Sequence, residues 1–207
     1  LPRLIGDFTK RYTKVVIRVH VGDTDQIVED IISNRLDFGV VGAETTKGRI
    51  AQKPLLIDEM RLIVRSDHKW ASKTAVDVKS LAKEPFIIRE KGSGTLRSLA
   101  KKLNDKGIDI KSFSVAAELG STASVIQGIK SGIGVSILSP IAVADELQTG
   151  ALKALTVKGL DLKRHFYLTM HQDRTPSPLC KAFMEYLEGV FAKNIKIETA
   201  ALSAQSS

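Results

Sequence analysis

The sequence has only one cysteine among its 207 residues, and it has no apolar run near the ~18 residues that a membrane-spanning helix needs. A single cysteine, Cys180, excludes an internal disulfide and a metal site built from several cysteines, and it is typical of a reducing compartment. Aromatic residues are also scarce, at 5%, and their spacing is that of core positions and not of a nucleic-acid surface. We therefore expect a cytoplasmic protein with no membrane span, and no DNA contact from these residues.

The signatures of common enzyme classes are missing as well. The sequence contains no Gly-x-Ser-x-Gly, no phosphate-binding loop that ends in Gly-Lys-Ser/Thr, and no His-Glu-x-x-His metal helix. Gly132-Ile133-Gly134 begins a dinucleotide fingerprint, but it precedes a predicted strand instead of following one. The histidines are scattered, and Cys180 is expected as a small buried apolar residue. We predict that the chain is not an enzyme and uses no cofactor or metal ion.

The sequence does contain enough apolar residues for a core, together with an excess of positive charge. Hydrophobic residues make up 43% of the chain and charged residues 26%, and 31 Lys and Arg against 23 Asp and Glu give a net charge of +8. This composition predicts a globular chain of one large or two small domains. The positive charge favours anionic partners without choosing among nucleic acid, phospholipid and small anions.

The apolar pattern alternates between helical and strand spacing from the first residue onward. Residues 1–12 have helical spacing, 15–21 alternate as in a strand, 27–32 have helical spacing again, and 36–41 read as a second strand. This is the order of a parallel sheet with crossover helices. Because a crossover helix follows a strand, a helix that begins at Pro2 implies a first strand that is missing from these residues.

The same alternation continues through the rest of the chain. Strands are predicted at 54–57, 61–65, 85–89, 113–118, 134–138, 152–157 and 165–171, and helices at 76–82, 96–103, 125–129, 140–147 and 179–190. We predict an α/β fold of two Rossmann-like lobes joined by two crossing strands, with lobe I at 1–64 and 164–192, lobe II at 65–163, and a C-terminal tail at 193–207. Ligands in such folds bind beyond the carboxyl ends of strands, so a cleft between the lobes is the expected site.

Three predicted strand-to-helix turns carry small hydroxylated residues: Gly22-Asp23-Thr24, Gly92-Ser93-Gly94-Thr95 and Gly120-Ser121-Thr122. The free N–H groups and positive dipole end of a helix N-terminus attract an anion, and Ser or Thr hydroxyls add donors. The alternative is that these residues are only helix caps, each worth ~1 kcal/mol to its own helix. Asp23 would repel an anion and favours that alternative for the first turn.

A series of short motifs covers the chain from residue 1 to about residue 190. They are Leu1-Pro2-Arg3-Leu4-Ile5 with Phe8, Val19-x-Val21-Gly22-x-Thr24, Asp37-Phe38-Gly39-Val40-Val41-Gly42, Asp58-Glu59-x-x-Leu62-Ile63-Val64, Arg89-Glu90-x-Gly92-Ser93-Gly94-Thr95, and Glu118-Leu119-Gly120-Ser121-Thr122 with Gly132-Ile133-Gly134-Val135-Ser136-Ile137-Leu138-Ser139. In this order they resemble the effector-binding domain of LysR-type transcriptional regulators, and the series is also similar to members that control sulfur or selenium assimilation. The resemblance implies a fold like that of type II periplasmic binding proteins, in which a small effector between the lobes controls transcription allosterically.

The resemblance also implies partners. Promoter DNA would be read by an N-terminal winged helix-turn-helix outside this chain, and the effector domains would pair into homodimers or homotetramers. An extracytoplasmic solute-binding protein that delivers a small anion to a transporter has the same fold, and it is the alternative function.

Matched residue by residue, the family pattern implies eight effector-binding residues: Ser93, Gly94, Thr95, Ser121, Thr122, Gly42, Ala43 and Thr24. No arginine lies directly within the best turn, because Arg97 is two residues beyond Thr95. A carboxylate effector usually attracts an arginine. We therefore expect a small oxyanion held by backbone groups, or a neutral effector.

Overall fold

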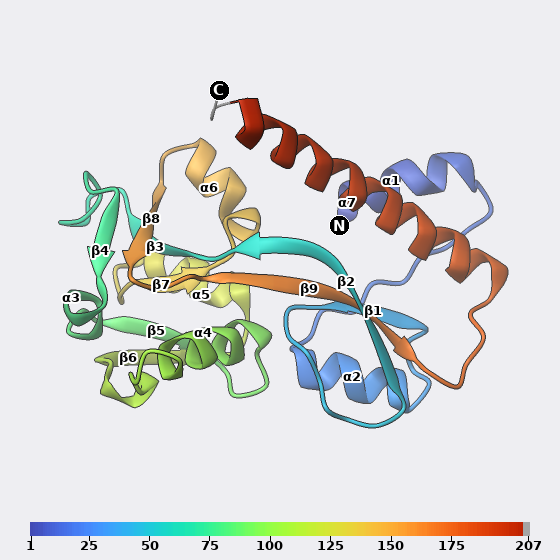
Figure 1. Cartoon of the computed structure of the whole chain (residues 1–207), viewed down its shortest axis with the longest axis horizontal. Coiled ribbons are helices and arrows are strands. Elements are labelled where there is room, and N and C mark those ends of the chain that lie inside the picture. The colour runs from blue at the N-terminus through green and yellow to red at the C-terminus, as the bar shows by residue number, and fades with distance from the viewer. Residues whose placement is uncertain (205–207) are drawn as a thin grey trace. The chain divides into compact units, whose positions relative to one another are not determined.

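The structure is a computed structural model that describes the backbone of residues 1–204 and the side chains of residues 1–192 (Figure 1). It divides into two compact units. The first contains Leu1–Gly22, Gln26–Ile57 and the chain from His165 onward, and the second contains Asp23–Asp25 and Asp58–Arg164. The chain passes between the units within strands β2 (Ile50–Glu59) and β9 (Lys163–His171), which are the two crossing strands that the sequence predicts.

The first crossing lies earlier in the chain than the predicted boundary at residue 64. Strand β3 (Arg61–Arg65) belongs to the second unit, where it pairs with β7 and β8. Its central residues Leu62, Ile63 and Val64 are fully buried in the apolar clusters of that unit. The two consecutive strands β2 and β3 have similar apolar patterns, so the pattern alone does not indicate which of them ends the first lobe.

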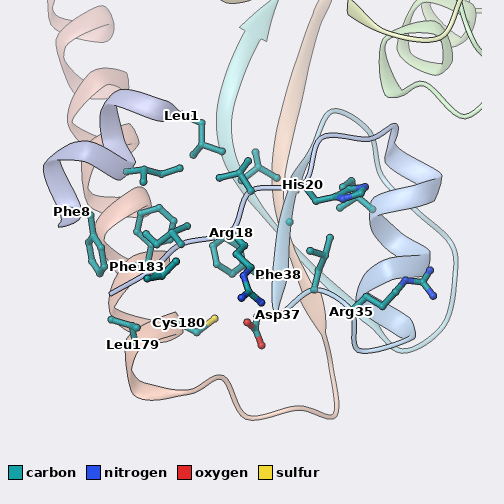
Figure 2. A pocket seen from close by; sticks show the side chains of 18 of the residues that line it. Leu1, Phe8, Arg18, His20, Arg35, Asp37, Phe38, Leu179, Cys180 and Phe183 are labelled. Carbon is teal, nitrogen blue, oxygen red and sulfur yellow. The ribbon is translucent and has the colours of Figure 1, made fainter. Parts of the chain in front are cut away.

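A three-stranded sheet in the order β1-β9-β2 forms the centre of the first unit. The other elements of this unit are β1 (Phe38–Val41), α1 (Pro2–Arg11), most of α2 (Thr24–Ile32), and α7 (Pro178–Ala204). Strand β1 pairs antiparallel with β9, with Val41 opposite Tyr167. Helices α1 and α7 share an apolar cluster in which the rings of Phe8 and Phe183 lie 4.7 Å apart (Figure 2). Helix α2 buries Ile27 and Ile31 in a separate cluster.

The second unit is built on a four-stranded sheet in the order β4-β8-β3-β7 and a two-stranded sheet of β5 and β6. Its elements are β4 (Ala75–Asp77), α3 (Val78–Ala82), β5 (Phe86–Arg89), α4 (Gly94–Asn104), a 3-10 turn (Ile110–Ser112), β6 (Val115–Leu119), α5 (Thr122–Lys130), β7 (Ser136–Leu138), a second 3-10 turn (Pro140–Val143), α6 (Ala144–Gln148) and β8 (Leu152–Lys158). A bridge between Phe86 and Val135 joins β5 to the residues before β7. Gly134 allows this approach, because a Cβ there would lie 2.3 Å from the Pro85 carbonyl oxygen.

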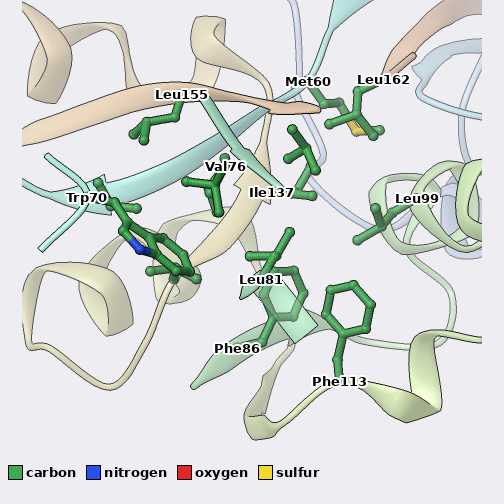
Figure 3. Packing of buried hydrophobic residues seen from close by; sticks show 14 of the residues in the cluster. Met60, Trp70, Val76, Leu81, Phe86, Leu99, Phe113, Ile137, Leu155 and Leu162 are labelled. Atoms are coloured by element: carbon green, nitrogen blue, oxygen red, sulfur yellow. The ribbon is translucent and has the colours of Figure 1, made fainter. Parts of the chain in front are cut away.

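The larger core of the second unit lies between its sheet and helices α3 and α4 (Figure 3). The rings of Phe86 and Phe113 meet edge to face with centroids 5.2 Å apart. Trp70, the single tryptophan of the chain, is 6% exposed and packs into the same cluster. Phe86 anchors β5 in this cluster, and β5 leads directly to the candidate site described below.

Three predicted segments differ from the structure. Residues 75–77 form strand β4, which pairs with β8, so the helix predicted at 76–82 begins at Val78. Residues 15–21 alternate as a strand, but no other described segment pairs with them and they belong to no sheet. The predicted tail at 193–207 is helical as far as Ala204, where α7 ends, and residues 205–207 lie outside the described residues. Positions 193–204 contain neither Gly nor Pro, so nothing in that sequence stops the helix. Among the described residues, no helix combines the length and the apolar character needed to cross a membrane.

Candidate functional site

Two of the three predicted turns lie next to each other in the second unit. Strands β5 and β6 are parallel and end together, with Arg89 opposite Leu119. Helix α4 begins at Gly94 after β5, and helix α5 begins at Thr122 after β6. Both helix N-termini therefore follow the carboxyl ends of neighbouring parallel strands, which is where α/β folds bind ligands.

Ser93 and Ser121 are the caps of these helices. The Ser93 hydroxyl accepts a hydrogen bond from the Thr95 amide at 3.2 Å, and the Ser121 hydroxyl accepts one from the Ser124 amide at 3.0 Å. Ser93 is 2% exposed. Both serines therefore act as helix caps, as the alternative interpretation of the sequence predicts. Capping uses one acceptor site on each hydroxyl.

The two threonine hydroxyls, by contrast, each receive a hydrogen bond from an arginine. Arg164 Nη1 donates to Thr95 Oγ1 at 3.1 Å, and Arg89 Nη1 donates to Thr122 Oγ1 at 2.6 Å. The expectation that arginine is scarce at these turns is therefore wrong. Arg89 at the end of β5 and Arg164 near the start of β9 place their guanidinium groups at the two turns. Each helix N-terminus thus combines free amides with a positive side chain.

Arg164 is held by a buried carboxylate. Its Nε donates to Asp58 Oδ2 at 2.9 Å, and the second oxygen of Asp58 accepts a hydrogen bond from the Ser139 hydroxyl at 2.7 Å. The side chains of Arg164 and Asp58 are 7% and 2% exposed. Burial lowers the pKa of Arg164, Asp58 opposes this, and the positive charge of Arg89 lowers it further. Arginine nevertheless stays protonated in proteins, so this is a fixed buried positive charge.

Arg89 is paired with its neighbour in the chain. Its Nε donates to Glu90 Oε2 at 2.6 Å, and a second guanidinium nitrogen donates to Glu90 Oε1. Burial raises the pKa of Glu90, but the hydrogen bonds and the charge of Arg89, together with a backbone hydrogen bond, hold that pKa below its ordinary value. The positive charge of Arg89 disfavours the protonated form of Arg164, so the two charges oppose each other in the site. Such a pair favours a bound anion, which would offset this repulsion.

The other three predicted residues come from segments outside β5, β6 and the helices that follow them. Gly42 and Ala43 are buried in the first unit, immediately after the carboxyl end of β1, and their role in effector binding stays a prediction. Thr24 is 5% exposed and is the first residue of α2. Near it, a Cβ on Gly92 would lie 2.6 Å from the Asp23 carboxylate, so any other residue at this position would push that carboxylate aside.

Arg97, which the sequence set apart from the best turn, is bound to a carboxylate in the structure. Its Nη2 donates to Asp25 Oδ1 at 2.8 Å. Both side chains are partly exposed, at 36% and 44%. Like Arg89 and Arg164, Arg97 thus has an acidic partner, but the hydrogen bonds to the two threonine hydroxyls come from Arg89 and Arg164. Within the part of the chain that the structure describes, no group of three or more His, Cys, Asp or Glu side chains could hold a metal ion.

Sequence reasoning did not single out Arg89, Arg164 and Asp58 as members of the candidate site. Arg89 ends a predicted strand directly before the best turn, so its place at a strand end was a usable signal. Asp58 and Arg164 are separated by 106 positions, and no spacing rule connects them. Their proximity follows only from the two strands in which they lie.

Comparison with known proteins identifies the family of this fold. The LysR substrate binding domain family matches residues 1–192. The chain belongs to this family. The expected fold class is confirmed as well. The regulatory domain of CcmR from Synechocystis, solved in complex with 2-PG, superimposes with a TM-score of 0.82 at 29% identity. The match covers 92% of this chain and 90% of that one. The effector-binding domain of QuiR in complex with shikimate has a TM-score of 0.81 at 20% identity, covers 93% and 90% of the two chains, and shows the fold alone.

Relatives of this LysR-family chain are named as transcriptional regulators. The RuBisCO operon transcriptional regulator of Acidithiobacillus ferrooxidans is 29% identical over 187 residues, which are 90% of this chain and 60% of the regulator. The HTH-type transcriptional activator CmpR of Synechocystis is 28% identical over 187 residues, with the same two coverages. The chain thus spans about 60% of the length of these relatives. These names do not favour the alternative of a solute-binding protein.

Proposed function

We propose that this domain senses a small anionic effector for a LysR-type transcriptional regulator, and that the anion binds where α4 and α5 begin. The observation that carries the proposal is the pair of arginines, Arg164 and Arg89, that donate to the hydroxyls of Thr95 and Thr122. Two guanidinium groups, two hydroxyls and the free amides of two helices offer several charge-assisted hydrogen bonds to one anion.

The effector class that fits this site is a small organic phosphate or another compact oxyanion. The related CcmR domain was solved with 2-PG, 2-phosphoglycolate, which carries a phosphate and a carboxylate. Two anionic groups suit two positively charged helix N-termini. The net charge of +8 adds a long-range attraction for such ligands.

The rest of the regulator follows from the same proposal. Promoter DNA is bound by a winged helix-turn-helix outside residues 1–207, and the protein acts in the cytoplasm as a homodimer or homotetramer. The domain is not an enzyme: effector binding makes and breaks no covalent bond, and it acts only through its different affinity for two conformations of the regulator. A full reversal of such a switch needs ~5.5 kcal/mol of differential affinity, which several charge-assisted hydrogen bonds can supply.

Thermal unfolding with added anions tests this function. At a concentration of 100 times its Kd, an effector adds ~2.7 kcal/mol to the stability, which is a rise of about 5–10 °C in Tm for a domain of this size. We expect this rise with 2-phosphoglycolate. The double variant Thr95→Val with Thr122→Val removes both hydroxyls, keeps their volume, and should abolish most of the rise. Thr156→Val is the matched control, because its exposed hydroxyl bonds only to the Thr74 carbonyl, away from these turns.

The possible outcomes test the location of the site and the chemical class of the effector separately. A rise with sulfate or thiosulfate but none with 2-phosphoglycolate would keep the site and replace the organic phosphate by the inorganic sulfur anions to which the motif series also points. A rise that is equal in the double variant and in the control would remove Thr95 and Thr122 from the site. No rise with any of these anions or with inorganic phosphate would contradict an anion-sensing function.

A further inference from the structure

The four charged side chains of the candidate site cancel one another. Arg89 and Arg164 carry the positive charges, and Glu90 and Asp58 carry the negative charges. All four residues belong to the second unit. Their side chains are between 2% and 20% exposed, so salt and water screen these charges only weakly. If both carboxylates stayed in place, an anion bound beside the arginines would give this partly buried region a net negative charge, which is costly.

Asp58 is fixed in the site. Its carboxylate accepts hydrogen bonds from Arg164 Nε at 2.9 Å and from the Ser139 hydroxyl at 2.7 Å. The Asp58 side chain is 2% exposed, and Ser139 is buried as well. Moving this carboxylate to solvent would leave Arg164 and Ser139 in the interior without this partner, and the loss of a partner by buried polar groups is strongly destabilising. Asp58 therefore stays where it is when an anion binds.

Glu90 has a different setting. Its side chain is 20% exposed, the largest fraction of the four, and it lies in the turn between β5 and α4. Both of its carboxylate oxygens accept hydrogen bonds from one guanidinium group, that of Arg89. The backbone closes the turn independently of this side chain, because the Glu90 carbonyl accepts a hydrogen bond from the Ser93 amide at 2.9 Å. The carboxylate can therefore rotate away from Arg89 while the backbone of the site stays in place.

The Glu90 carboxylate binds Arg89 as a ligand would. Contact with two nitrogens of one guanidinium group is the geometry in which arginine recognises carboxylates and phosphates. Arg89 is also the arginine that donates to Thr122 Oγ1 at the start of α5, where the proposed anion binds. An anionic group that approaches this helix must therefore compete with Glu90 for Arg89.

We propose that Glu90 is an internal competitor of the effector, which holds Arg89 in the free domain and is displaced from it when an anionic group of the effector binds. This inference rests on the anion-sensing function proposed above. The displacement of Glu90 sets a threshold that the bonds between the ligand and Arg89 must exceed. A phosphate ester exceeds it, because it carries about 1.5–2 negative charges at neutral pH and has three acceptor oxygens. A single carboxylate only replaces one such bond by another, so Glu90 disfavours simple monocarboxylates as effectors.

Titration calorimetry of the 207-residue chain with 2-phosphoglycolate tests this competition, with sulfate as the probe if only sulfate raises the Tm. Glu90→Gln removes the negative charge and keeps the size of the side chain, and we expect it to lower the Kd at least tenfold. Glu90→Asp keeps the charge but is one methylene shorter, so it should hold Arg89 less well and lower the Kd about threefold. Glycolate, which lacks the phosphate, should bind the wild-type chain at least tenfold more weakly than 2-phosphoglycolate does.

Glu84→Gln is the matched control, because it changes the net charge of the second unit by the same amount. Glu84 precedes β5, whereas Glu90 follows it, so the two carboxylates lie at opposite ends of this strand. The Glu84 side chain is 13% exposed and is likewise paired with basic groups, His68 Nε2 at 3.1 Å and Lys69 Nζ at 2.6 Å. We expect Glu84→Gln to change the Kd less than twofold.

Four results would overturn the proposal. An equal or higher Kd in Glu90→Gln would mean that Glu90 only orients Arg89, and an equal gain in Glu84→Gln would mean that net charge alone matters. A wild-type Kd in Glu90→Asp would mean that Glu90 repels the ligand without occupying Arg89. Equal binding of glycolate and 2-phosphoglycolate to the wild-type chain would show that no threshold exists. In each of these cases the anion still binds and the proposed function stands, whereas no binding of any probe to any of these proteins would contradict that function as well.

Discussion

Asp58 and Arg164 show how much one buried pair can matter at the scale of single residues. Replacing Asp58 by Ala leaves the Arg164 guanidinium in a low-dielectric site without its counter-charge. We expect Asp58→Ala to lower the free energy of unfolding by about 3–5 kcal/mol, the range for breaking a buried pair from one side. Urea denaturation at neutral pH measures this loss.

The matched control for that change is an exposed ion pair. Lys53 Nζ lies 2.7 Å from Glu188 Oε2, and the Lys53 side chain is 62% exposed. Lys53→Ala should cost about 0–1 kcal/mol, because solvent screens such pairs. Similar losses for both variants would show that water reaches Arg164 and that the Asp58 pair is not a buried one.

Local sequence signals predict where the helices of the site begin, but they do not predict the arginines beside those helices. The helix starts at 94 and 122 could be predicted, because helix starts after strands have local signals in residue type and spacing. The same signals predict Ser93 and Ser121 as caps, which the structure confirms. Arg164 could not be found, since what makes it special is a carboxylate that lies far away in the sequence.

At the scale of elements, two glycines of the chain should respond in opposite ways to the same substitution. A Cβ on Gly134 would meet the Pro85 carbonyl oxygen at 2.3 Å, and a backbone oxygen cannot rotate away as a side chain can. Gly134→Ala should therefore lower the free energy of unfolding by at least about 1–3 kcal/mol, the range for overpacking a core. Gly6 lies inside α1 with no atom within 4 Å of its added Cβ, so Gly6→Ala should raise stability by about 0.5–1 kcal/mol.

Urea denaturation of both variants checks this pair of changes. If Gly134→Ala is as well tolerated as Gly6→Ala, the bridge between β5 and the residues before β7 must be loose enough to move by several tenths of an ångström. The N-terminus of α4 would then rest on a flexible strand, which would weaken the case for a preorganised anion site.

Local pattern predicted most elements in their observed order, because helical and strand periodicities are strong in this chain. It predicted strand 15–21 from the same signal, yet pairing is a property of two segments. The alternation at 15–21 shows that its side chains would suit a β-sheet, but it does not show whether a second strand is present to pair with it. The strand predicted at 15–21 was therefore wrong, since the local pattern carries no information about pairing.

At the scale of the whole molecule, the two units differ in how the chain builds them. Apart from residues 23–25, the second unit is one continuous stretch, and it contains two complete apolar clusters. The first unit needs chain from both ends. A continuous unit with its own core has what it needs to fold alone. We expect a fragment of residues 56–166 to fold cooperatively without the rest.

Trp70 reports on that fragment, since the single tryptophan lies in its larger core. Its fluorescence should be shifted to shorter wavelength relative to the urea-unfolded fragment, and should change in one sharp transition. The fragment loses Asp25 as the partner of Arg97, but that pair is partly exposed and should be worth less than about 1 kcal/mol. It keeps Asp58 and Arg164, whose ion pair ties its two ends together, so Asp58→Ala should weaken the fragment at least as much as the whole chain. A broad transition with solvent-exposed tryptophan emission would instead show that the second unit is stable only when the first unit is present.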